Sequence, residues 1–151
     1  MFTHRTRTIL AHLLLGVGAA CVLATGADHL YEYAATGFSS IPTIGTLFLL
    51  NFIAATIVGA GLLLPLRRIA ARLADLVRTL LALSGIGIAA SSLIALWISE
   101  SSSLFGFTDY GFRTTIVVAI VAESTAILAL TAHLALSGAR TLIPRTQPRT
   151  Q

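Results

Sequence analysis

Four stretches of this chain are apolar for about twenty residues each, the length that a helix needs to cross the hydrocarbon core of a bilayer. They cover residues 9–27, 44–64, 79–98 and 114–137. Their apolar residues run continuously instead of alternating, which is a poor fit to the strands of a membrane barrel. A helix also satisfies its own backbone hydrogen bonds in lipid. The sequence therefore predicts an all-α bundle of four antiparallel transmembrane helices in a single domain, residues 1–138.

The composition agrees with helices that face lipid. Hydrophobic residues make up 56% of the 151 residues and charged residues only 11%, whereas a soluble domain has about 45–50% and about 25%. All ten basic residues are arginines, and they cluster at the ends of the apolar stretches without interleaved aromatic residues. This pattern is not typical of a nucleic-acid surface. We therefore expect the partners to be the lipid bilayer and other membrane proteins, and no nucleic acid.

The arginines also predict the orientation, because cytoplasmic segments of membrane proteins carry an excess of basic residues. In a four-span arrangement only Arg113 falls on the side opposite to the two termini. We therefore predict cytoplasmic termini and a multi-pass protein of the plasma (cytoplasmic) membrane. Residues 139–151 are polar, contain two prolines and are expected to form a disordered cytoplasmic tail.

The first apolar stretch has one alternative interpretation, a cleaved signal peptide, because Arg5 and Arg7 precede it. The apolar part of a signal peptide is typically about 7–15 residues long. The stretch here runs from Thr8 to Ala27 without a formal charge. We therefore interpret it as the first transmembrane span.

Glu123 is the most unusual residue of the apolar stretches, because it lies about ten residues into the fourth one and therefore near the bilayer middle. A charged side chain there costs at least about 2.5–3.5 kcal/mol, and such residues usually face the interior of a bundle. Asn51, Ser91 and Ser92 lie at a similar depth in other stretches. One hypothesis is a proton-coupled carrier or channel that uses Glu123 with Asn51. The other, which we favour, is a protonated Glu123 that is hydrogen-bonded to Asn51 or a serine and so holds helices together.

Two histidines, His12 and His133, lie near the cytoplasmic ends of the first and fourth stretches. The first and last helices of an up-and-down bundle are neighbours, so the two imidazoles would lie at one depth. Paired imidazoles can ligate haem iron, as in a redox membrane protein. The alternative is a pair of interfacial histidines bonded to hydroxyl or backbone groups. We expect the latter, and we expect no cofactor.

Acidic residues gather with one histidine beyond the outer ends of the spans. His29 and Glu32 are three positions apart, which places them on one helix face, and Asp28 is adjacent. The other outer loop contributes Glu100 and Asp109. Oxygen donors with one imidazole suit several divalent cations. The alternative, which we favour, is a set of ordinary solvated acids in outer loops.

No catalytic motif is present, because the sequence contains no G-x-S-x-G, phosphate loop, paired cysteines or zincin signature. We therefore expect a protein that is not an enzyme. Small residues recur at four-residue spacing, as in Gly16, Ala20 and Ala24, and such faces let helices approach closely. They serve packing within the chain, contacts with another chain, or both. The leading prediction is a subunit or scaffold of a membrane assembly, with a membrane-protein partner or as a homo-oligomer.

Several segments are similar to those of small four-span membrane proteins of actinobacteria that carry no assigned activity. These are His29-Leu30, residues 41–51 with the sequence IPTIGTLFLLN, residues 104–107 with LFGF, and Glu123. The resemblance covers most of the chain and implies an inner-membrane protein, without a mechanism or site residues. Small multidrug transporters also have four spans and one membrane-embedded glutamate. Their glutamate belongs to the first span, whereas Glu123 belongs to the fourth, so we reject this match.

Overall fold

A computed structural model describes residues 4–69, 71–108 and 113–138. Within these residues the chain forms four long helices, α1 (His4–Ala35), α2 (Ile44–Leu63), α4 (Ala74–Ser101) and α5 (Thr114–Gly138). A short 3₁₀ helix, η1 (Phe38–Ser40), precedes α2, and the one-turn helix α3 (Leu66–Ile69) precedes α4. Each long helix is long and apolar enough to cross a bilayer. The structure therefore confirms the all-α helical bundle, and its four long apolar helices indicate a multi-pass membrane protein.

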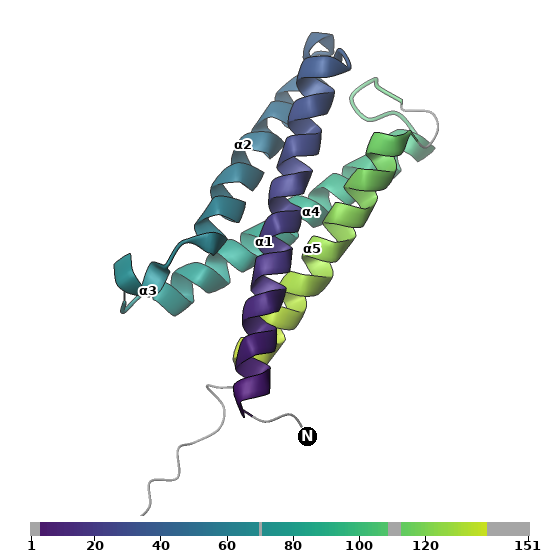
Figure 1. Cartoon of the computed structure of the whole chain (residues 1–151). Coiled ribbons are helices and arrows are strands. Elements are labelled where there is room, and N and C mark those ends of the chain that lie inside the picture. The colour runs from purple at the N-terminus through teal and green to yellow at the C-terminus, as the bar shows by residue number, and fades with distance from the viewer. Residues whose placement is uncertain (1–3, 70, 109–112, 139–151) are drawn as a thin grey trace, which may run out of the picture.

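The four long helices form a ring in which each packs against two neighbours (Figure 1). Helix α1 makes extensive contacts with α5 and α2, and α4 completes the ring by packing against the same two helices. The diagonal contact between α1 and α4 is small. The segment between α1 and α2 and the segment between α4 and α5 lie at the same end of the bundle (Figure 1). We call this end the η1 end, because it carries η1.

The half of the bundle away from the η1 end is filled by a close-packed apolar core. Val22, Leu62 and Leu130 are among its largest fully buried side chains. Leu130 of α5 fits between two glycines on neighbouring helices. A Cβ atom added at Gly18 would lie 2.5 Å from Leu130 Cδ2, and one added at Gly85 would lie 2.9 Å from Leu130 Cδ1. Glycines at these positions therefore let three helices approach closely around one leucine.

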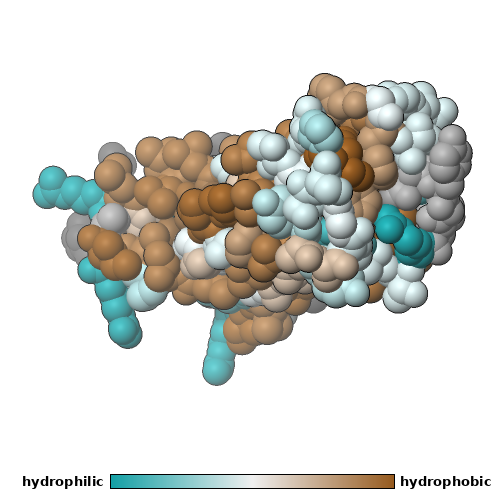
Figure 2. All heavy atoms as spheres, turned by 90° about the horizontal axis from the view of Figure 1, so that it is seen from above, coloured by the Kyte–Doolittle hydropathy of each residue, from teal (hydrophilic) through white to brown (hydrophobic). Residues whose placement is uncertain are grey.

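The outer surface of the helices is largely apolar, as contact with lipid requires. Large hydrophobic side chains are exposed on every long helix, among them Leu13, Ile57, Leu80 and Leu128. Seen from above, hydrophobic side chains cover much of the surface, and the most hydrophilic ones project from its edges (Figure 2). The apolar residues of this chain thus serve two purposes, a small core inside the ring and a lipid-facing surface outside it.

Helices α2 and α5 have nearly the same residue bounds as the second and fourth apolar stretches. Helices α1 and α4 extend beyond the first and third stretches at both ends. Helix α1 continues to Ala35 instead of ending at Ala27, because it contains no proline and its glycines keep helical backbone. The left-handed φ of Gly37, 91°, follows its end. The acids and the histidine that were predicted in the first outer loop therefore lie on the last turns of α1, which corrects that prediction. The predicted tail, residues 139–151, and Asp109 lie outside the described residues.

Candidate functional site

A cavity of about 100 Å³ lies inside the ring at the η1 end. Its walls come from the last turns of α1, the start of α2, the end of α4 and the start of α5, and η1 and the segment before α5 contribute further side chains. A cavity of about 150 Å³ holds one benzene molecule. The cavity here therefore has room for a compact molecule of about four or five heavy atoms.

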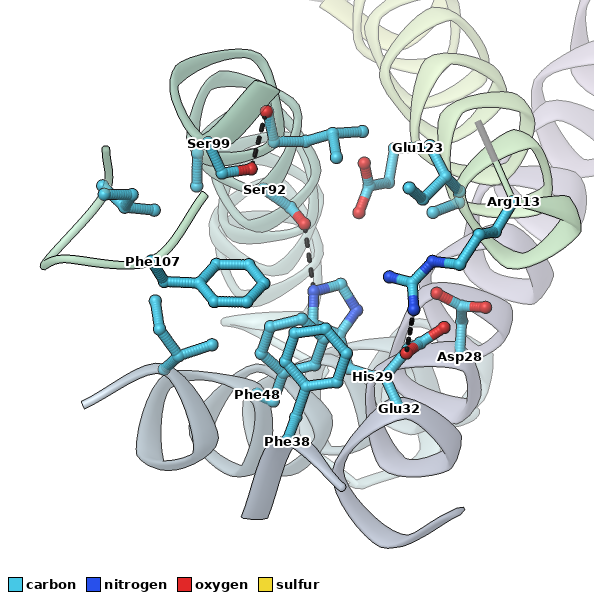
Figure 3. Close-up of a pocket in the computed structure, with 16 residues that line it drawn as sticks. Asp28, His29, Glu32, Phe38, Phe48, Ser92, Ser99, Phe107, Arg113 and Glu123 are labelled. Carbon is cyan, nitrogen blue, oxygen red and sulfur yellow. Dashed lines mark hydrogen bonds and ion pairs between the residues drawn. The ribbon is translucent and has the colours of Figure 1, made fainter. Parts of the chain in front are cut away.

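Glu123 points from α5 into this cavity (Figure 3). The residue is only 1% exposed. Neither of its carboxyl oxygens is within hydrogen-bond distance of a partner among the residues that the structure describes, and the hydroxyl group of Ser92 lies nearby. A buried polar group without a partner is costly, and in native proteins it usually meets a water molecule, an ion or a ligand. Glu123 is therefore the residue of this wall that most clearly requires a partner from outside the chain.

His29 of α1 and Ser92 of α4 are joined across the cavity wall by a hydrogen bond of 3.1 Å between Nε2 and Oγ (Figure 3). The other ring nitrogen, Nδ1, lies 2.9 Å from the backbone oxygen of Thr25, one turn earlier in α1. The imidazole packs against the ring of Phe48, with 4.9 Å between the ring centroids. These contacts hold the buried imidazole in one orientation, with Nε2 toward α4.

Charged groups gather on the α1 and α5 side of the cavity. Glu32 is only 4% exposed, and its Oε2 accepts a hydrogen bond of 2.7 Å from the hydroxyl group of Thr36. The same oxygen lies 3.9 Å from Nη1 of Arg113. Asp28 lies one turn earlier on α1, beside this pair (Figure 3). Two carboxyl groups therefore flank the guanidinium group.

Three phenylalanines form another part of the wall. The rings of Phe38 and Phe48 are stacked with their centroids 4.8 Å apart, and Phe107 meets Phe38 edge-on at 5.4 Å. Gly45 allows η1 to lie against α2, because a Cβ atom there would be 2.5 Å from the backbone oxygen of Phe38. The guanidinium carbon of Arg113 lies 5.5 Å from the centroid of Phe38, within the range of a cation–π interaction.

The wall thus combines three carboxyl groups, one guanidinium group and one imidazole with aromatic rings. Acidic groups outnumber the guanidinium group, and aromatic faces attract cations. Chemically, the arrangement suits a small molecule with a positive charge and an apolar part better than it suits an anion.

The predicted membrane-embedded cluster is only partly brought together. Glu123 and Ser92 both line the cavity, whereas Asn51 and Ser91 do not. Ser91 is exposed, and its hydroxyl group donates to the backbone oxygen of Ile88. The side-chain oxygen of Asn51 is buried and has no partner within the described part of the chain. The expected hydrogen bond between Glu123 and Asn51 is therefore not formed in this structure.

The predicted metal-binding set is also divided. Asp28, His29 and Glu32 line the cavity, and Glu100 does not. In residues 4–69, 71–108 and 113–138, no three His, Cys, Asp or Glu side chains are placed so that they could hold a metal ion. Because Asp109 lies outside those residues, the metal-site hypothesis for the complete set is not tested.

The two histidines of the haem hypothesis have different surroundings. His12 is exposed on α1, and its Nδ1 lies 2.8 Å from the backbone oxygen of Thr8. His133 is buried on α5, and its Nδ1 lies 2.7 Å from the backbone oxygen of Ala11 in α1. His133 thus connects α5 to α1 through a backbone group. The expectation that the two residues bind no haem stays a prediction.

The sequence analysis did not place several residues of the cavity in one site with Glu123. They are Arg113, the three phenylalanines and, above all, His29 as a neighbour of Ser92. One signal was available in the sequence, because Thr25, His29 and Glu32 repeat at spacings of four and three residues. This spacing places all three on one face of a helix, and all three are buried.

Comparisons with protein-family models, with curated proteins and with solved structures give no significant match.

Proposed function

We propose that the protein binds a small organic cation in this cavity, with Glu123 as the principal counter-ion. The observation that carries the proposal is the buried carboxyl group of Glu123, which points into the cavity and has no partner among the described residues. A carboxylate offers an ammonium or guanidinium group both an opposite charge and hydrogen-bond acceptors. A bound cation would therefore supply what Glu123 lacks.

The rest of the wall supports a cation over an anion. Asp28 and Glu32 add acidic groups on one side, and the stacked rings of Phe38 and Phe48 add aromatic surface on another. The guanidinium group of Arg113 lies over Phe38 and beside Glu32. Arg113, a cationic side chain, thus already makes the two kinds of contact that a cationic ligand would make, one with an aromatic ring and one with a carboxyl group.

The proposal includes the arrangement predicted from the arginines, an antiparallel bundle in the plasma membrane with cytoplasmic termini. In that arrangement the η1 end and its cavity face the extracytoplasmic side. The close-packed core around Leu130 lies between the cavity and the cytoplasm, which favours a binding pocket over an open pore. A carboxyl group can hold either a proton or a cation. The proton-coupled carrier predicted from the sequence is therefore compatible with this proposal, because Glu123 would exchange one for the other. Ser92 and His29 then take the place of Asn51.

The orientation is tested by reporter fusions along the chain. Fusions after Arg72 and after the last residue should report a cytoplasmic location, and fusions at Ala35 and Ser102 should report an external one, because arginine-rich segments stay inside. An alkaline phosphatase and green fluorescent protein pair gives opposite signals at each position. A cytoplasmic signal at Ser102 would contradict the four-span orientation.

Cation binding is tested by the substitution Glu123→Gln. Glutamine keeps the size and hydrogen-bonding ability of the side chain but removes its charge. We expect the affinity for tert-butylammonium to fall by at least about tenfold, or about 1.4 kcal/mol, while the protein stays folded. Isothermal titration calorimetry of the purified protein measures the affinity, and circular dichroism checks the fold.

The matched control for this experiment is Glu100→Gln, the same chemical change in α4 outside the cavity wall. It should alter the affinity by less than about twofold, as expected of a substitution away from the site. Equal affinities of the wild type and Glu123→Gln would remove Glu123 from the proposed role.

The subunit or scaffold role predicted from the sequence is a second candidate, and one observation favours it. Apart from the adjoining residues of its own helix, a Cβ atom added at Gly16 or Gly87 would meet no atom within 4 Å, so these glycines leave open surface on α1 and α4. Small residues on a lipid-facing surface allow another helix to approach closely. Purification in a mild detergent with a stoichiometric partner, or as a defined homo-oligomer, would support this role.

A further inference from the structure

We infer that Ser92 determines the specificity of the cavity and selects cations that carry N–H groups over quaternary ammonium ions. The inference rests on the proposed cation binding and adds the chemical class of the cation. It follows from the direction of the hydrogen bond between Ser92 and His29 and from the acceptors that surround it.

The backbone of α1 fixes the hydrogen position on the imidazole of His29. The nearest partner of Nδ1 is the backbone oxygen of Thr25, at 2.9 Å. A carbonyl oxygen only accepts hydrogen bonds, so Nδ1 carries a hydrogen and donates it. In the neutral ring, which is the main form of histidine above pH 7, Nε2 then carries none. Nε2 therefore accepts the hydrogen bond of 3.1 Å from the hydroxyl group of Ser92.

This direction makes Ser92 an acceptor toward the cavity. A serine hydroxyl group has one hydrogen and two lone pairs, and the hydrogen of Ser92 is directed at His29. Only the lone pairs are left for a molecule in the cavity. His29 is thus a positioning residue, since it acts on the ligand through Ser92.

Glu123 presents acceptors to the same space. As a carboxylate it offers two oxygens, and neither has a partner in the described segments of the chain. A primary ammonium group carries three N–H donors and can serve Ser92 and Glu123 together. A quaternary ammonium ion carries no donor and would leave these buried acceptors without hydrogen bonds, which lowers affinity. The N–H bearing cation has two possible sources, a free amine or the headgroup of an aminolipid.

Two cations of matched size test the inference, tert-butylammonium and tetramethylammonium. Both have five heavy atoms, one positive charge and a compact tetrahedral shape, but only the first has N–H groups. Titration calorimetry on the full-length protein in a maltoside detergent should show that the wild type binds tert-butylammonium at least about tenfold more tightly. Ser92→Ala should remove most of this preference by weakening tert-butylammonium binding, with less than about a twofold change for tetramethylammonium.

Two further variants separate specificity from folding. Ser91→Ala is the matched control, because the neighbouring hydroxyl group is exposed and bonded within its own helix, and it should keep the preference. His29→Leu leaves Ser92 in place but frees its hydrogen, so it should also reduce the preference. Circular dichroism confirms that each variant is folded.

The outcomes separate the inference from the proposed function. Equal binding of both cations by the wild type, or an unchanged preference in Ser92→Ala, would overturn the role of Ser92 and leave cation binding intact. Binding of neither cation by the wild type would overturn both. Nanodiscs identify the source of the cation. Weaker tert-butylammonium binding in phosphatidylethanolamine than in phosphatidylcholine supports a lipid headgroup, and equal binding supports a free amine.

Discussion

Gly18→Ala should destabilise the bundle by about 1–3 kcal/mol, the usual cost of overpacking a close-fitted core. A Cβ atom at this position would lie 2.5 Å from Cδ2 and 2.6 Å from Cγ of Leu130. Leu130 is fully buried and is also held against Gly85 on the opposite side, so it cannot turn away without another collision. The change is measured by thermal or denaturant unfolding in detergent, followed by circular dichroism.

Gly16→Ala is the control for this prediction, in the same helix and two residues away. Apart from the adjoining residues of its own helix, no atom lies within 4 Å of a Cβ atom at Gly16. Alanine is also the better helix former by about 0.5–1 kcal/mol. This variant should be as stable as the wild type or slightly more stable. Equal stability of the Gly16 and Gly18 variants would show that the contact with Leu130 does not limit packing.

A double substitution tests whether the cost arises at this contact. Leu130→Ala alone should cost about 2–5 kcal/mol, because it leaves a cavity in a close-packed core. In the combined Gly18→Ala and Leu130→Ala variant the added methyl group meets no leucine. The two costs should therefore sum to more than the measured loss, as for other residues in direct contact. If the stability losses of the two single variants add up to that of the double variant, the cost of Gly18→Ala does not arise at the contact with Leu130.

The helices were predictable because a bilayer constrains length and composition more strongly than water does. The turn between α1 and α2 contains Pro42 and the span of α2 is followed by Pro65, so both ends of that helix are marked in the sequence. The end of α1 was missed because Asp28, His29 and Glu32 resemble a solvated loop in composition. They belong to the helix, since nothing before Gly37 interrupts it.

The inward orientation of Glu123 was also predictable, from the cost of exposing a charge to lipid. Its neighbours were not, because sequence position gives the depth of a residue but not the rotation of its helix. Ser91 and Ser92 differ by about 100° around the helix axis, and only Ser92 faces the cavity. Asn51 lies at a suitable depth on a different face. The rotation of a helix about its axis is set by its packing. In this chain glycines and alanines occur on several faces of each helix, so they do not show which face points inward.

Arg113→Gln should raise the affinity for tert-butylammonium by about five- to tenfold, or about 1–1.4 kcal/mol. The guanidinium group lies 3.9 Å from Glu32 and over the ring of Phe38. A cationic ligand bound as proposed would have to compete with it for both contacts. Two like charges about 8 Å apart repel by about 2 kcal/mol at an effective dielectric constant of about 20. Solvent reduces this value, because the side chain of Arg113 is 43% exposed.

The control is Arg67→Gln, which removes the same charge from an exposed ion pair at the opposite end of the bundle. Its effect on affinity should be less than about twofold, because salt screens charges at that distance.

Without ligand, Arg113→Gln should unfold at a lower temperature than the wild type, since it leaves the buried carboxyl group of Glu32 without its ion pair. Saturating tert-butylammonium should restore most of that loss, because a bound cation replaces the missing one and stabilises the folded state by mass action. An affinity that stays the same or falls would show that Arg113 assists the ligand instead of competing with it.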